Sequence, residues 1–229
     1  MKKVLVVEDE EAIRSFIVIN LIRSGYEVVD TDCGEKALEL FKPDNFSVVI
    51  LDIMMPGIDG FTVCKKIRNL DTNVGIIFLS AKSQEMDKVN GLMLGADDYI
   101  TKPFSPSELV ARVDASFRRF ELIEKRTGSN SVLISGDFTI DTKSRAVTKF
   151  GNEIVLTQME YQLLEYFFKN ANTAISRENL LNKIWGGGYF GDEKTVDVNI
   201  RRLRMKLEDN PSEPVHLITV WGYGYKWCE

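Results

Sequence analysis

The stretch SVVILDIMMPGIDG, residues 47–60, begins as an apolar run rich in β-branched residues and reaches an aspartate, Asp52. A run of this kind predicts a buried strand. An acid at the tip of such a strand raises the question of what lies beyond the strand's end. The segments on either side of this strand extend the same pattern through the first half of the chain.

The first half of the chain alternates apolar runs with amphipathic segments. In the latter, residues such as Leu109, Val113 and Phe117 recur at helical spacing. The alternation predicts an α/β doubly wound five-stranded parallel sheet with helices on both faces. Ligands of such sheets bind beyond the carboxyl ends of the strands. The expected strands are residues 3–7, 26–31, 46–51, 75–80 and 98–101.

The composition of the chain fits a two-domain protein without disulfides or membrane spans. The chain has 229 residues, 44% of them hydrophobic, and a net charge of −5. Its cysteines, Cys33, Cys64 and Cys228, are odd in number and far apart, which favours neither a disulfide framework nor a zinc site. No apolar run is long enough for a signal peptide or a membrane span. We therefore expect a cytoplasmic protein with no membrane partner.

A polar, glycine-containing stretch, ELIEKRTGSNS, interrupts the alternation at residues 121–131. It predicts a helix end that runs into a linker. The boundaries expected from it are a first domain at 1–121, a linker at 122–131 and a second domain at 132–229.

The second domain has a different order of elements, which predicts an α+β fold. Short alternating segments between 132 and 155 predict a small antiparallel sheet with a turn at Gly151 and Asn152. The terminal segment LITVWGYGYKW predicts a hairpin. The helices expected between them cover residues 157–169, 176–185 and 194–208.

Polar residues at several strand ends of the first domain suit a phosphoryl site. The first strand is followed by Glu8 and Asp9, and Asp52 follows the third. Each acid alone is more often a solvated terminus or a helix cap, but together they repel, by roughly 4 kcal/mol for a pair about 4 Å apart at an intermediate dielectric. A cation is therefore expected among them, and Mg²⁺ suits such oxygen ligands. Lys102 and Ser80 would surround a phosphoryl group carried by Asp52.

Residues 194–208, KTVDVNIRRLRMKLE, predict an amphipathic helix with a basic outer side. Its apolar stripe consists of Val196, Ile200, Leu203 and Leu207. Such a helix suits the major groove of DNA, where arginine pairs with guanine edges or phosphates. The alternative is a solvated charged face, partly neutralised by acidic residues. The residues expected to point away from the stripe are Lys194, Val198, Arg201, Arg202 and Met205, with Arg204 on a flank.

Residues 1–121 resemble the receiver domain of two-component response regulators, through VVEDE, ILDIMMPGIDG, LSAKS and DDYITKPF. The resemblance implies that Asp52 accepts phosphate from a sensor histidine kinase. It also implies that Asp9, Asp52 and the carbonyl of Met54 hold Mg²⁺, with Glu8 acting through a metal-bound water.

Further site residues follow from the same resemblance. Lys102 would contact the phosphate, across a peptide bond to Pro103 that the family commonly keeps cis. Ser80 and Tyr99 would be the switch pair, with the hydroxyl moving to the phosphate and the ring turning inward. Phosphorylation would then be a local charge event that biases a two-state element.

Residues 132–227 resemble the effector domain of OmpR/PhoB-type regulators, a winged helix-turn-helix, through LTQMEYQLLEYF, SRENLLNKIWG, KTVDVNIRRLRMKLE and ITVWGYGYKW. The resemblance implies a recognition helix at 194–208, a loop at 186–193 that meets RNA polymerase, and a wing at 219–227. Trp221 stands where several members carry arginine, so it packs either on a sugar or on its own domain. The expected DNA contacts are Lys194, Thr195, Val198, Asn199, Arg201, Arg202, Arg204, Trp221 and Tyr223.

The resemblance also implies a homodimer formed on phosphorylation through charged residues of the receiver. Their signs alternate, so a two-fold arrangement would pair Lys88 with Glu108, Asp97 with Arg119 and Asp98 with Arg112. Exposed pairs of this kind contribute little energy, and their value is the choice of partner.

Together these features predict a transcriptional regulator that is phosphorylated on Asp52 and binds promoter double-stranded DNA as a dimer. A receiver with a protein- or RNA-binding output module is the alternative. An enzyme that uses Asp52 as a covalent intermediate is disfavoured, because such hydrolases favour an acid where Met54 stands. We expect Mg²⁺-dependent phosphoryl acceptance and slow self-dephosphorylation, and no other enzymatic activity.

Overall fold

The computed structural model describes residues 2–81, 93–124, 132–187, 189 and 192–229, without the side chains of Ala81 and residues 119–124. The chain divides into two compact units, Met1–Phe120 and Glu121–Glu229. Each unit closes around a hydrophobic core of its own. Helix α5 (Pro106–Glu124) continues into the stretch expected to be the start of the linker.

The first unit is a parallel five-stranded sheet in the order β2-β1-β3-β4-β5. All four strand pairs are parallel, and β1, the first strand of the chain, lies between β2 and β3. The α/β doubly wound prediction is confirmed. The strands are β1 (Lys3–Val7), β2 (Glu27–Thr31), β3 (Val48–Asp52), β4 (Gly75–Ala81) and β5 (Asp98–Lys102).

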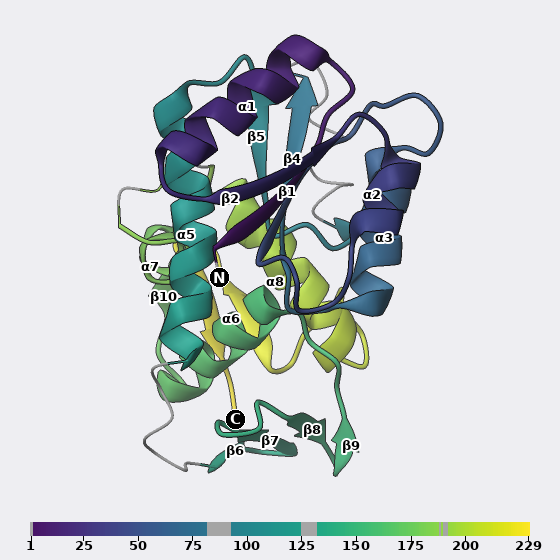
Figure 1. The fold of residues 1–229 in the computed structure, drawn as a ribbon. Coiled ribbons are helices and arrows are strands. Elements are labelled where there is room, and N and C mark those ends of the chain that lie inside the picture. The colour runs from purple at the N-terminus through teal and green to yellow at the C-terminus, as the bar shows by residue number, and fades with distance from the viewer. Residues whose placement is uncertain (1, 82–92, 125–131, 188, 190–191) are drawn as a thin grey trace. The chain divides into compact units, whose positions relative to one another are not determined.

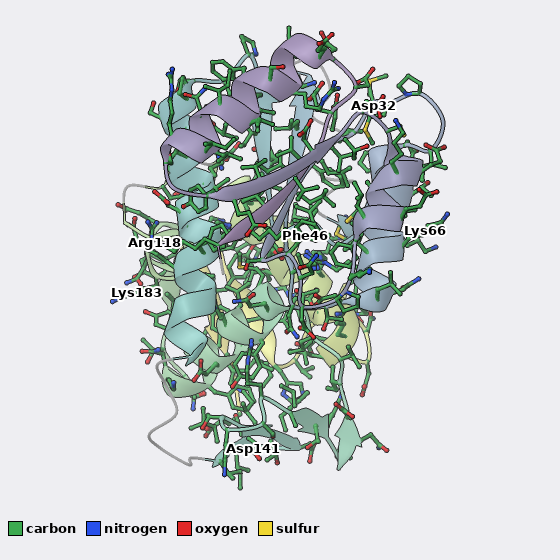
Figure 2. All side chains as sticks on the ribbon, viewed as in Figure 1. Asp32, Phe46, Lys66, Arg118, Asp141 and Lys183 are labelled. Carbon is green, nitrogen blue, oxygen red and sulfur yellow. The ribbon has the colours of Figure 1, made fainter. Side chains whose placement is uncertain are left out.

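Helices cover both faces of this sheet. Figure 1 shows α1 (Glu11–Arg23) and α5 on one face, and α2 (Gly34–Leu40) and α3 (Gly60–Leu70) on the other. The apolar sides of the helices face the strands: on α3, Val63 and Ile67 are buried, whereas Lys66 points outward (Figure 2). The helix expected between β4 and β5 falls largely on residues 82–92, outside the described part of the chain.

The register of the sheet brings separate parts of the sequence to one edge. Val7 is the register partner of Leu51, so the residues that follow each of them lie next to each other at the carboxyl ends of β1 and β3. Ser80 is likewise the partner of Thr101 at the ends of β4 and β5. The strand-tip residues of the first unit therefore converge without any further adjustment of the chain.

The second unit has the α+β winged-helix architecture that the sequence predicts. An antiparallel four-stranded sheet precedes three helices, and a three-stranded sheet carries the terminal hairpin. The strands are β6 (Val132–Ser135), β7 (Phe138–Asp141), β8 (Val147–Lys149), β9 (Asn152–Glu153), β10 (Ile175–Ser176), β11 (Leu217–Val220) and β12 (Gly224–Trp227). The helices are α6 (Gln158–Lys169), α7 (Arg177–Ile184) and α8 (Lys194–Leu207).

One turn of this unit differs from the prediction by a residue. The centre of the β8–β9 turn is Phe150 and Gly151, with φ of 52° and 79°, because Lys149 pairs with Asn152. Positive φ at both central residues is the requirement of a type I′ hairpin, and Gly151 meets it without strain. Among the helices of the described ranges, none has the length and apolar character needed to cross a lipid bilayer.

Candidate functional site

Three carboxylates meet at the carboxyl edge of the parallel sheet. Oxygen atoms of Glu8, Asp9 and Asp52 all lie within 4.8 Å of one another. Glu8 and Asp52 are buried at this point because β1 and β3 end side by side. Hard oxygen donors at this spacing match the ligand preference of Mg²⁺. The structure thus brings together the acids that the sequence identified as a metal site.

Lys102, the last residue of β5, places its ammonium group among these acids. Its Nζ lies 2.8 Å from the Asp52 carboxylate and 2.9 Å from that of Glu8. Burial works to lower the pKa of Lys102, but its hydrogen bonds to Asp52 and Glu8 outweigh burial and raise it. When all three carboxylates are ionised, one ammonium leaves two negative charges, which a divalent cation would neutralise.

The pKa of Glu8 reflects its burial and the negative charge around it. Burial, reinforced by repulsion from Asp52, raises the pKa of Glu8 from 4.5 to about 7, although its hydrogen bond with Lys102 acts in the opposite direction. The folded protein therefore holds Glu8 partly protonated near neutral pH.

Ser80 lies near the carboxyl end of β4, and Tyr99 lies on the neighbouring β5. The Ser80 hydroxyl is buried and, within the described part of the chain, has no hydrogen-bond partner. Since leaving a buried donor unpaired is unfavourable, the hydroxyl is suited to a ligand oxygen in the pocket. The Tyr99 ring is buried, and the Lys102–Pro103 peptide bond is cis, as expected. The role of the Met54 carbonyl as a metal ligand stays a prediction.

Gly60 is a residue of this site that the sequence reasoning missed. It starts α3 after the N-cap Asp59, whose carboxylate accepts a hydrogen bond from the Thr62 amide. A Cβ at Gly60 would lie 2.1 Å from the carbonyl oxygen of Asp52. Only glycine lets α3 approach the end of β3 this closely, and the signal for it was the second glycine of the quoted motif GIDG.

In the second unit, the predicted apolar stripe of α8 is confirmed. Val196, Ile200, Leu203 and Leu207 are all buried in one core cluster. On the other side of the helix, Lys194 and Arg201 are exposed.

Arg202 is a correction to the expected outer face of α8. Its side chain is buried, and its guanidinium lies 2.9 Å from the carboxylate of Glu160 on α6. Glu160 is fully buried and forms a capping box with Thr157. A buried carboxylate of this kind requires a cationic partner. Lys206 supplies a second cation at 2.6 Å. Burial would raise the pKa of Glu160, but Arg202 and Lys206 outweigh it and lower the pKa.

Thr195, Val198 and Asn199, which the sequence also placed among the DNA contacts, are buried in the structure. The side-chain amide of Asn199 donates to the carbonyl of Thr195 at 2.8 Å, which satisfies one of its donors within the helix. Val198 lies outside the core cluster of the second unit, so it is not part of the helix's apolar stripe.

Arg204 connects α8 to the terminal hairpin through hydrogen bonds. Its guanidinium donates to the carbonyl of Leu217 at 2.8 Å and to the hydroxyl of Thr219 at 2.9 Å. At the tip of the hairpin, Trp221 is 91% exposed and Tyr223 is 51% exposed. Of the two placements considered for Trp221, packing on its own domain is therefore excluded.

The charged residues expected at a dimer interface are engaged within the chain. Asp98 pairs with Arg112 at 2.9 Å, and Arg112 pairs with Glu108 at 3.0 Å. Asp97 pairs with Arg68 of α3 at 2.7 Å. Lys88 and the side chain of Arg119 lie outside the described part of the structure. Pairing between two copies stays a prediction.

Comparisons with known proteins agree with this geometry. Residues 4–114 match the family described as response regulator receiver domain, and residues 151–227 match transcriptional regulatory protein, C terminal. The chain is 41% identical to the sensory transduction protein RegX3 of Mycolicibacterium smegmatis over 99% of both chains.

Solved structures show the same similarity. A mutant of RitR is 26% identical over 99% of both chains, with a TM-score of 0.78. DrrB, an OmpR/PhoB homolog of Thermotoga maritima, is 32% identical over 100% of both chains, with a TM-score of 0.51.

The fold and the site define a receiver domain joined to a DNA-binding output domain. The chain belongs to the OmpR/PhoB-type response regulators of two-component systems. The expected class of function is therefore confirmed.

Proposed function

We propose that Asp52 accepts a phosphoryl group from a sensor histidine kinase and thereby controls binding to promoter DNA. A carboxylate oxygen of Asp52 attacks phosphorus as the phosphorus–nitrogen bond to the kinase histidine breaks. The observation that carries this proposal is the charge balance at the sheet edge, where three carboxylates within 4.8 Å share one ammonium. Asp52 lies in contact with that ammonium, which is thus placed to meet the incoming phosphoryl oxygens.

Glu8, Asp9, Asp52 and the Met54 carbonyl would hold Mg²⁺ in this pocket. When bound, the ion supplies charge neutralisation for the phosphoryl oxygens. Lys102 holds a second position on the phosphoryl group through its Nζ, which already lies at hydrogen-bond distance from Asp52. The chain itself thus provides the nucleophile, one fixed cation and the metal ligands, and the same pocket supports slow self-dephosphorylation without further enzymatic activity.

Ser80 and Tyr99 form the switch in this proposal. The buried Ser80 hydroxyl, which has no hydrogen-bond partner among the described residues, gains a phosphoryl oxygen as its acceptor only after phosphorylation. A contact available to one state alone shifts the equilibrium toward that state. Tyr99 on β5 is the register partner of Phe78, two residues before Ser80 on β4, and it follows Asp98, so β5 links the switch to the charged residues of the receiver surface.

The phosphorylated receiver would dimerise through Lys88, Asp97, Asp98, Glu108, Arg112 and Arg119. Arg112 already contacts Asp98 and Glu108 within its own chain, so a symmetric dimer would exchange the Asp98–Arg112 pair between copies and release Glu108 to pair with Lys88 of the second copy. The energy gained by such an exchange is small, and the arrangement selects the identical regulator as partner. Two linked output domains then bind neighbouring half-sites with avidity.

In the output domain, α8 would enter the major groove and the hairpin tip the minor groove. The exposed Lys194 and Arg201 supply phosphate or base contacts, whereas Thr195, Val198 and Asn199 are buried and are not proposed as contacts. Trp221 and Tyr223 project from the hairpin and would pack on sugars. The loop at 186–193, between α7 and α8, would meet RNA polymerase. Arg202 and Arg204 hold contacts within the domain, so we assign their main role to orienting α8 and the wing.

Size-exclusion chromatography with and without beryllofluoride and Mg²⁺ tests the link between site and assembly. The treated protein is expected to elute as a dimer and to bind duplex DNA more tightly, with a strong salt dependence. Asp52→Asn is expected to remain unchanged by the treatment. An untreated and a treated wild-type sample with the same elution volume and the same DNA affinity would contradict the proposal.

A further inference from the structure

Arg14, on the second turn of α1, contacts the backbone that carries two of the acidic ligands. Its Nη1 donates to the carbonyl oxygen of Glu8 at 2.7 Å and to that of Asp9 at 3.2 Å. Its Nε lies 3.2 Å from the carboxylate of Asp30, the fourth residue of β2. One guanidinium therefore ties together the end of β1, the start of α1 and the neighbouring strand.

Other hydrogen bonds also hold the turn that Arg14 contacts. The amide of Glu8 donates to the carbonyl of Thr31 at 3.1 Å, and the Glu8 carboxylate accepts from the Glu10 amide at 3.4 Å and from Lys102 at 2.9 Å, whereas Arg14 is the side chain that contacts the backbone carbonyls of both Glu8 and Asp9. At the N-cap of α1, Glu10 makes no side-chain capping hydrogen bond within the described part of the chain. The orientation of the peptide between Glu8 and Asp9 sets the direction of both side chains. One nitrogen, Nη1, donates to both successive carbonyls while Nε contacts Asp30, so the planar guanidinium restrains the backbone that directs both carboxylates.

We propose that Arg14 is a positioning residue for the divalent cation: it orients Glu8 and Asp9 without touching the ion. This inference rests on the cation site of the proposed function. It also has an opposing effect to overcome, because a guanidinium close to a cation repels it. Asp30 offsets part of that positive charge. The sign of the change in Mg²⁺ affinity on removal of Arg14 thus separates positioning, which predicts weaker binding, from charge alone, which predicts tighter binding.

Calorimetric titration of Mg²⁺ into the metal-free full-length protein measures this sign. Arg14→Ala is expected to raise the dissociation constant for Mg²⁺ by about tenfold, the lower end of the effect of residues that orient metal ligands. Arg14→Lys keeps the charge, but its single nitrogen cannot occupy the positions of both Nη1 and Nε, so it is expected to weaken binding severalfold. Arg23→Ala, at the exposed far end of the same helix, removes the same charge and is expected to bind Mg²⁺ as the wild type does.

The outcomes separate the inference from the proposal on which it depends. Wild-type protein that binds no Mg²⁺ would remove the cation site itself. Wild-type binding together with equal or tighter binding in Arg14→Ala would overturn only the role of Arg14. Far-UV circular dichroism and thermal unfolding without metal check that each variant is folded. If Arg14→Ala does not fold, Arg14→Lys decides: unchanged affinity in that variant overturns the inference.

Discussion

Glu8 offers a quantitative test of the charge balance at the sheet edge. Its side chain is fully buried, and its pKa is raised from 4.5 to about 7 in the metal-free protein. For a carboxyl group raised in this way, the folded state binds more protons than the unfolded state between these two values. Its contribution to stability is therefore present below the lower pKa and is lost as pH rises through the upper one.

The size of this loss follows from the shift. At 1.36 kcal/mol per pKa unit, the rise to about 7 corresponds to roughly 3 kcal/mol. Glu8→Gln removes the titrating group. We expect the free energy of unfolding of the variant, relative to that of the wild type, to increase by about 3 kcal/mol between about pH 5 and about pH 8 in the presence of a chelator. Added Mg²⁺ should shrink this difference, because it stabilises the ionised form of the wild type.

Urea unfolding monitored by hydrogen exchange in peptides of β1 and β3 isolates the receiver from the second unit. Glu10→Gln is the matched control, since Glu10 is exposed and lies 3.9 Å from Lys102, so the same charge change is made outside the buried cluster. The stability of Glu8→Gln could instead change with pH in parallel with that of the wild type. That result would refute the argument that burial has a larger effect on the pKa of Glu8 than the neighbouring ammonium has.

Other residues give further predictions. Gly60→Ala should destabilise the receiver by about 1–3 kcal/mol and slow labelling by acetyl phosphate, because the new Cβ collides with the Asp52 carbonyl, whereas Gly187→Ala, which meets no atom within 4 Å, should do neither. Glu160→Gln should lower the stability of the output domain by about 3 kcal/mol and weaken DNA binding, because Arg202 loses its buried partner. Urea unfolding monitored by tryptophan fluorescence measures the stability, and an unchanged midpoint would contradict this prediction. Trp221→Ala should weaken duplex binding without altering its salt dependence, whereas Trp221→Arg should steepen the logarithmic salt slope by about one, as titrations at several salt concentrations would show; equal slopes would exclude a phosphate near the wing tip.

The sequence was sufficient for most of the fold and for the acidic site. Strands such as 3–7 and 98–101 were recognisable because residues buried on both faces of a parallel sheet form continuous apolar runs. The convergence of Glu8, Asp9, Asp52 and Lys102 followed from topology alone, since each lies at the carboxyl end of a strand in one sheet.

Contacts between elements were beyond the reach of a helical wheel. Arg202 lies off the apolar stripe of α8, so periodicity placed it outside, yet Glu160 of α6 draws it into a buried ion pair. A helical wheel describes one helix only, so it cannot include a buried charge on a neighbouring helix. Gly60 and Arg14 were missed for the same reason: one is defined by a close approach to the Asp52 carbonyl, the other by bonds to backbone oxygens. Neither leaves a periodic signal.

The most direct test of the account is the position of the covalent label. Intact-mass spectrometry of the full-length protein after incubation with acetyl phosphate and Mg²⁺ should show a single phosphoryl group. Borohydride reduction followed by peptide mapping should place that group on Asp52, and Asp52→Asn should carry no label. A label mapped to another residue, or a label of undiminished amount on Asp52→Asn, would contradict the account.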